Sequence, residues 1–189
     1  MERAETSGRS TGVRSVDDGE ASCISAPPNA LEVADFVGAN FTDRKIVFIH
    51  AKHGRGRRVS ASALHDVVAQ ALKNLGVLSP GGATPSRLSH WHRKAKWSKS
   101  KIKRWIRGGS ALPTRKDLWQ HIRNEILDHP HGTKEVWLVV GKTLNRAEFL
   151  HQLTNPNDRD SVTGQLVYLL SGLSASCTQL SVRLRVFCD

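Results

Sequence analysis

The chain has 189 residues, which is enough for one domain with a buried core. Lysine and arginine number 28 against 17 aspartate and glutamate residues, so the formal net charge is +11. This excess favours a polyanionic partner, and the lack of any apolar stretch of about 18 residues excludes a membrane-spanning helix. Cys23, Cys177 and Cys188 form no CxxC pair, and the N-terminus has no apolar signal core, so we expect a cytoplasmic protein without a disulfide framework.

The N-terminal region divides into a polar lead-in and the start of a domain. Residues 1–28 are rich in Ser, Gly, Glu and Arg and end in two prolines, which predicts a disordered segment. Residues 29–189 are predicted to form a single α/β domain. Apolar residues recur at helical spacing over Ala30–Gly38, so a short helix is predicted there.

A strand and a long helix are predicted next. Lys45–Lys52 contains a continuous apolar, β-branched run that is typical of a buried strand. Leu64–Leu75 carries apolar residues along one stripe of a 3.6-residue period, which predicts an amphipathic helix.

The second half of the chain continues the alternation of helices and strands. The predicted elements are a helix over Leu118–Leu127, a strand over Glu135–Val140, a helix capped by Asn145 and running to Leu153, a helix over Ser161–Leu173 and a strand over Val182–Cys188. This order predicts an α/β fold with a central mixed or mostly parallel sheet flanked by helices.

Candidate site residues gather at the end of the first predicted strand. His50 and Lys52 are two residues apart, so they point to one face at the carboxyl end, where ligands of open α/β sheets tend to bind. On the following helix, Asp66 and Gln70 lie away from the apolar stripe. Two interpretations stay open: a packed histidine with a solvated helix face, or a phosphodiester-cleaving site in which the lysine stabilises a pentacoordinate phosphate.

Several segments also resemble a known family. Glu32–Val37 (EVADFV), Phe48–Lys52 (FIHAK) and Ser62–Asn74 resemble a C-terminal region attached to bacterial DEAD/DEAH-box helicases of restriction-like defence systems. Trp137–Leu144 and the closing Leu184–Cys188 resemble the end of that region, so the resemblance runs from about Glu32 to the last residue.

This resemblance implies a restriction-endonuclease-like domain, similar to PD-(D/E)XK nucleases, that acts on the DNA backbone beside a helicase-type partner. In the comparison with PD-(D/E)XK nucleases, Lys52 would be the motif lysine, His50 would replace the motif glutamate, and Gln70 would be the helix glutamine. Asp35 or Asp66 would then hold Mg²⁺ or Mn²⁺, with the choice of carboxylate open. The alternatives are a non-catalytic DNA-binding adaptor that recruits a partner protein, and an interaction domain for an acidic protein.

The basic segment 87–107 is the second candidate region and is predicted to be partly helical. No acidic residue occurs between Asp66 and Asp117, and Trp91, Trp97 and Trp105 are interleaved with cations. The tryptophans are interpreted either as anchors in the core or as stacking platforms for bases. The predicted nucleic-acid-binding residues are Arg93, Lys94, Lys96, Lys99, Lys101, Lys103, Arg104 and Arg107, with Arg55, Arg57 and Arg58 from the glycine-rich loop.

Overall fold

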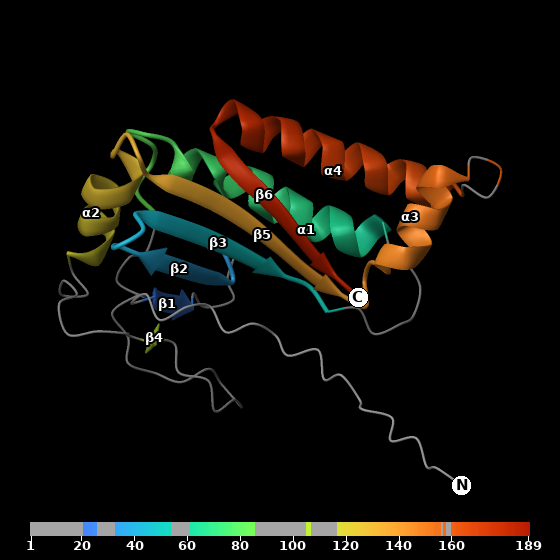
Figure 1. Ribbon diagram of the computed structural model, residues 1–189, viewed down its shortest axis with the longest axis horizontal. Coiled ribbons are helices and arrows are strands. Elements are labelled where there is room, and N and C mark those ends of the chain that lie inside the picture. Colours follow the sequence, from blue (N-terminus) through green and yellow to red (C-terminus); the bar gives the residue numbers. More distant parts are fainter. Residues whose placement is uncertain are drawn as a thin grey trace, which may run out of the picture.

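The computed structural model describes residues 21–25, 33–53, 61–85, 105–106, 117–155, 157 and 160–189, the first and fourth of these ranges by their backbone alone. These ranges form a six-stranded sheet in the order β4-β1-β2-β3-β5-β6 (Figure 1). Its strands are β1 (Ala21–Ser25), β2 (Phe36–Asn40), β3 (Lys45–Ala51), β4 (Trp105–Ile106), β5 (Thr133–Gly141) and β6 (Val182–Cys188).

The sheet is mixed, and its two halves differ in strand direction. β1, β2 and β3 form an antiparallel meander, with β4 antiparallel to β1. β3, β5 and β6 run parallel. This arrangement confirms the predicted α/β class with a mixed sheet.

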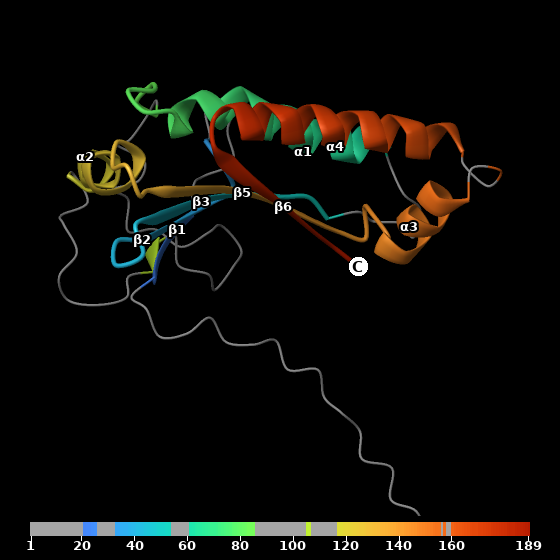
Figure 2. The ribbon, with the colours of Figure 1, turned by 45° about the horizontal axis from the view of Figure 1, so that its top comes forward.

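Two helices cover one face of this sheet. α1 (Ala61–Asn74) and α4 (Ser161–Gln179) lie side by side over β3, β5 and β6 (Figure 2). The shorter helices α2 (Leu118–Ile122) and α3 (Arg146–Thr154) lie beyond opposite ends of these strands (Figure 1). None of the described helices is long and apolar enough to cross a membrane.

The core lies between the two long helices and the sheet. Most of the apolar stripe of α1, including Leu64 and Val68, is buried as its periodicity predicts, whereas Leu72 is 40% exposed. From the sheet, Phe48 and Leu138 have exposed fractions of 1% and 0%. Truncating a side chain of this kind to alanine costs about 3–5 kcal/mol of stability, so this layer fixes where the strand ends lie.

The C-terminal elements agree closely with the sequence patterns. Asn145 caps α3 by accepting a hydrogen bond from the Glu148 amide at 2.8 Å. The helix predicted over Leu118–Leu127 is present as α2, which continues into a π-helical turn over Arg123–Leu127. α4 extends past the predicted Leu173 to Gln179, since its apolar character persists to Cys177.

Two N-terminal predictions are wrong. The segment predicted as a helix over Ala30–Gly38 forms β2 from Phe36 onward, because pairing with β3 outweighs a short helical periodicity. A tight turn, in which the Asn40 side chain accepts from the Asp43 amide at 3.0 Å, joins these two strands. The lead-in 1–28 contains the backbone of β1, so the sheet begins before residue 29.

The predicted helix in the basic segment is corrected over two residues. Trp105–Ile106 forms β4, which pairs with β1, because the chain gains a backbone ladder at this edge of the sheet. The rest of segment 87–107 lies outside the described residues.

Candidate active site at the end of strand β3

The backbone at the end of β3 is held on both sides. The Ala51 amide donates to Asp35 Oδ2 at 2.7 Å, and the Lys52 amide donates to the Val139 carbonyl of β5 at 2.9 Å. Thr143, which follows β5, donates from its hydroxyl to the Lys52 carbonyl at 3.5 Å. The main chain of Lys52 is therefore fixed, while its side chain remains 43% exposed.

Asp35 reaches this point because of the hairpin register. Phe36 lies opposite Ile49 in the β2–β3 ladder, so the residue before Phe36 arrives beside the last residues of β3. Burial raises the pKa of Asp35, although the Ala51 hydrogen bond and the positive charge of Lys52 act in the opposite direction. Ionisation of this buried carboxyl group is costly unless more positive charge comes close. A pKa perturbed in this way is typical of a functional site.

Asp66 completes the group from the helix layer. Its position on α1 brings its Oδ2 within 3.3 Å of the Lys52 Nζ. Both side chains are substantially exposed, at 62% and 43%, so the pair contributes about 0.5 kcal/mol or less to stability. We call Asp35, Lys52 and Asp66 the β3-end cluster; its formal charge is negative because two carboxylates face one ammonium group.

His50 lies in the buried layer behind this cluster. Only 1% of the residue is exposed, and its Nε2 has no hydrogen-bond partner among the described residues. Burial lowers the pKa of His50 to about 4, so the imidazole is neutral under physiological conditions. Alternation along the strand predicts that His50 and Lys52 share a face. The two side chains differ in their exposure to solvent, because Lys52 follows the last residue of β3 and is exposed, whereas His50 is buried.

Gln70 stands apart from the cluster. It is exposed on α1, one turn beyond Asp66, and its carbonyl accepts from the Asn74 side chain at 3.0 Å. No hydrogen bond joins the described Gln70 side chain to Lys52 or Asp66. Of the five predicted site residues, the structure therefore groups three, places His50 beneath them and leaves Gln70 outside.

All the predicted nucleic-acid-binding cations lie outside the described residues, so their role stays a prediction. These residues are Arg55, Arg57, Arg58, Arg93, Lys94, Lys96, Lys99, Lys101, Lys103, Arg104 and Arg107.

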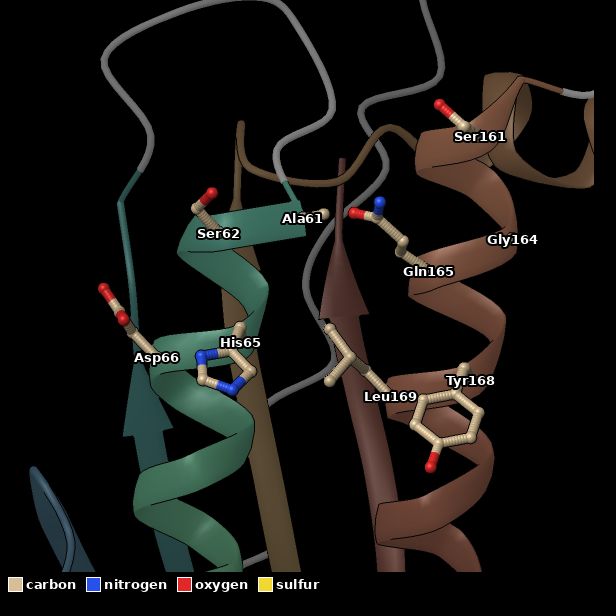
Figure 3. A pocket seen from close by; sticks show the side chains of 9 residues that line it. All are labelled: Ala61, Ser62, His65, Asp66, Ser161, Gly164, Gln165, Tyr168 and Leu169. Carbon is tan, nitrogen blue, oxygen red and sulfur yellow. The ribbon is translucent and has the colours of Figure 1, made fainter.

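A groove adjoins the β3-end cluster and was not predicted from the sequence. Its volume is about 680 Å³, and it lies between the N-terminal halves of α1 and α4 (Figure 3). His65 and Tyr168 stand on its two sides, and Leu169 and Gln165 extend between the helices (Figure 3). Asp66 is among its lining residues, with its carboxylate turned away from α4 (Figure 3). These side chains come from two helices, and Asp66 on α1 and Ser161 on α4 are 95 residues apart in the sequence. The periodicity of each helix therefore could not predict that their side chains line one groove.

A second charged group, also unpredicted, lies on the sheet face opposite α1 and α4. Glu135 is 1% exposed and is approached by Lys45 Nζ at 3.2 Å, Arg185 Nε at 3.0 Å and Arg183 Nη1 at 3.7 Å. The Trp137 indole N–H donates to Glu135 Oε2 at 2.6 Å. We call Glu135, Lys45, Arg183 and Arg185 the open-face cluster. The alternation of arginines in Val182–Cys188 was the available signal, but the partner strand could not be assigned from sequence.

Burial alone would raise the pKa of Glu135. Hydrogen bonds from Trp137, Lys45 and Arg185, together with the charge of Lys45, outweigh burial and hold the pKa below its usual value. Glu135 is therefore ionised and satisfied.

The β3-end cluster suits a hard cation better than a soft one. Asp35 and Asp66 offer carboxylate oxygens, which Mg²⁺ and Mn²⁺ prefer. Within the part of the chain that the structure describes, no three His, Cys, Asp or Glu side chains gather as a metal-ligand set. Two carboxylates fit an ion that keeps water and takes phosphate oxygens as further ligands, and they do not fit a closed zinc site.

Comparisons with protein families, with curated proteins and with solved structures gave no match for this chain.

Proposed function

We propose that the chain is a DNA-binding, nuclease-like domain of restriction-endonuclease-like architecture whose phosphodiester chemistry takes place at the β3-end cluster. Two features of the fold support this assignment. The meander β1-β2-β3 is followed by a helix and by the parallel strands β5 and β6, and the sheet order is β1-β2-β3-β5-β6 apart from the short edge strand β4. The succession of β3 and α1, a strand and then a helix, is similar to the order in PD-(D/E)XK nucleases.

The observation that carries the proposal is the meeting of Lys52 with two carboxylates. Asp35, from just before β2, and Asp66, from α1, are distant in sequence yet both act on the end of β3. The exposed ion pair between Lys52 and Asp66 adds little to stability, so stability does not explain why these two side chains meet.

Each residue at the end of β3 would have a separate role in the proposed cleavage. Asp35 and Asp66 would hold Mg²⁺ or Mn²⁺, which supplies charge stabilisation at phosphate oxygens and a more acidic water. The Lys52 ammonium group would stabilise the negative charge that develops on the pentacoordinate phosphate. His50 would stay neutral behind the cluster and leave Lys52 as its cation.

The partners follow from charge and resemblance. The net charge is +11, and its cations are concentrated in the basic segment 87–107 and in the loop of Arg55, Arg57 and Arg58. These cations would bind the phosphates of the DNA backbone with an affinity that falls as the salt concentration rises. The resemblance places such a domain beside a helicase-type protein in a cytoplasmic restriction or antiviral defence system.

One observation favours a second candidate function, a non-catalytic DNA-binding adaptor. His50 stands where the comparison with PD-(D/E)XK nucleases puts a glutamate, and it is buried and neutral. A site with that carboxylate replaced would bind DNA and recruit a partner without cutting.

Plasmid cleavage separates the two. Purified full chain is incubated with supercoiled plasmid and Mg²⁺ or Mn²⁺, and wild type is compared with Lys52→Ala and with Lys73→Ala, a control on α1. We expect Lys52→Ala to lose about 100-fold or more in rate, because a charge-stabilising group is removed, and Lys73→Ala to cut like wild type.

Two results would count against this function. If no protein cuts while all retain DNA binding, the adaptor function replaces the enzyme. If Lys52→Ala cuts as fast as wild type, the β3-end cluster is not the site of the reaction.

A further inference from the structure

The open-face cluster carries more positive charge than its own carboxylate needs. Lys45, Arg183 and Arg185 surround the single carboxylate of Glu135. Glu135 is almost fully buried, whereas the arginine side chains are 64% and 45% exposed. The excess of cations therefore faces solvent, where it raises the free energy of the surface unless an anion binds.

Aromatic rings lie next to this excess charge. Trp137 and Phe187 have ring centroids 5.1 Å apart with planes tilted by 55°. Phe187 is 43% exposed and Val139, its neighbour in the ladder, is 37% exposed. The hydrogen bond to Glu135 anchors the Trp137 ring, and Lys45 Nζ lies 5.9 Å from its centroid. The rings thus form a preorganised apolar surface with cations at its edge.

The ladder register turns these residues into a continuous track. Along β5 and β6, Glu135 pairs with Arg183, Trp137 with Arg185, and Val139 with Phe187. On the other side Val139 pairs with Ala51, the last residue of β3. The track therefore runs from the charged amino-terminal ends of β3, β5 and β6 to the strand end that carries the β3-end cluster.

We propose that this open face binds single-stranded nucleic acid, with bases stacked on Phe187 and Trp137 and phosphates against Arg183, Arg185 and Lys45. Every base offers a flat face to an aromatic ring, and every nucleotide carries one negative charge, so the chemistry of the face matches that of a single strand. A duplex keeps its bases stacked inside and offers no ring to Phe187. A second copy of this chain would bring two like-charged faces together.

This inference goes beyond the proposed cleavage and does not depend on it. Binding to the open face requires no metal and no β3-end cluster. Binding of a short single-stranded oligonucleotide is therefore measured without divalent metal, under conditions in which the proposed cleavage does not take place.

The test is fluorescence anisotropy with a labelled oligothymidine, without divalent metal, on the full chain. Phe187→Ser is compared with Leu150→Ser, a matched control on α3 where the leucine is 46% exposed. We expect Phe187→Ser to weaken binding about fivefold or more, as loss of a stacked base requires, and Leu150→Ser to leave it unchanged. The affinity for a duplex of equal length should change little in either variant.

Charge provides an independent readout. Arg183→Gln should reduce the slope of log affinity against log salt by about 0.7, the value for one phosphate contact on a single strand, and Arg183→Lys should preserve the slope. Far-UV circular dichroism of each variant ensures that the folded chains are compared.

Either of two outcomes would overturn the inference. Equal single-strand affinity for wild type, Phe187→Ser and Leu150→Ser would exclude base stacking on this face. If sedimentation instead shows a wild-type dimer that Phe187→Ser dissociates, with single-strand affinity unchanged, the face is an interface between copies.

Discussion

The β3-end cluster and the open-face cluster are built from the same kinds of side chain in opposite proportions. At the end of β3, two carboxylates face one lysine, and the ion pair between Lys52 and Asp66 is exposed to solvent. On the open face, three cations face one carboxylate, Glu135, which is almost fully buried. The β3-end cluster therefore has more carboxylates than cations, and the open-face cluster has more cations than carboxylates.

This difference indicates how one polyanion could use both clusters. An acidic site attracts a metal ion, and a metal ion attracts phosphate. A cationic surface attracts phosphate directly. Under the two proposals, the β3-end cluster would act on one phosphate, and the open-face cluster would hold the chain of phosphates that leads to it.

The largest effect on stability is expected from His50, which is buried behind the β3-end cluster. Its pKa of about 4 lies below the ordinary 6.5, so the unfolded chain binds the proton more readily. The contribution of neutral His50 is fully present above pH 6.5 and is lost as pH falls toward 4, amounting to about 3 kcal/mol.

Urea unfolding across this pH range checks the prediction. His50→Gln, which cannot titrate, should flatten the fall in the free energy of unfolding relative to wild type. Parallel curves for the two proteins would mean that the imidazole is already charged, or already solvated, in the folded chain.

A smaller loss is expected when the charge of Glu135 is removed. Glu135→Gln keeps the shape of the side chain but leaves Lys45, Arg183 and Arg185 facing one another, and we expect a cost of about 2 kcal/mol at neutral pH. The control Glu125→Gln, at an exposed position in the turn after α2, should change stability by about 0.5 kcal/mol or less.

The pH dependence gives this prediction a second criterion. The pKa of Glu135 is held below the ordinary 4.5, so its contribution is present above that value and is lost as pH falls through the lower value of the folded state. The difference between wild type and Glu135→Gln in chemical denaturation should therefore shrink in acid. A difference that stays constant with pH would show that the carboxylate charge is not what stabilises the open face.

The smallest effect has the opposite sign. Burial raises the pKa of Asp35, so ionising this group disfavours the folded state at all pH values above its folded pKa. Asp35→Asn should raise the free energy of unfolding at neutral pH by about 0.5 kcal/mol while impairing the reaction. Thermal melts test the expected gain in stability, and cleavage rates test the expected loss of activity. A loss of stability in Asp35→Asn would show that Asp35 serves the fold rather than a ligand.

The parts of this molecule that sequence predicts well are those fixed by local pattern. The run Ile46–Ile49, the stripe of α1 and the Asn145 cap each carry their own structural signal within a few residues. β2 was mistaken for a helix because Phe36–Asn40 has no strong local preference and becomes a strand through pairing with β1 and β3.

The same reasoning explains the outcome for the sites. Lys52 and Asp66 could be proposed because each follows from an element with a clear boundary. Glu135 could not, since its burial depends on β6 lying beside β5 in a register that brings Arg183 and Arg185 to it. The groove between α1 and α4 likewise depends on how two helices pack.

Metal binding at the β3-end cluster tests the central claim most directly. The free Mn²⁺ signal in electron paramagnetic resonance is followed as wild type, Asp66→Asn, Asp35→Asn and the control Glu148→Gln are titrated. We predict that wild type and Glu148→Gln bind Mn²⁺ and that each aspartate variant loses about tenfold or more in affinity. Equal binding by all four proteins, or none by wild type, would contradict the assignment of Asp35 and Asp66 as the metal-binding carboxylates.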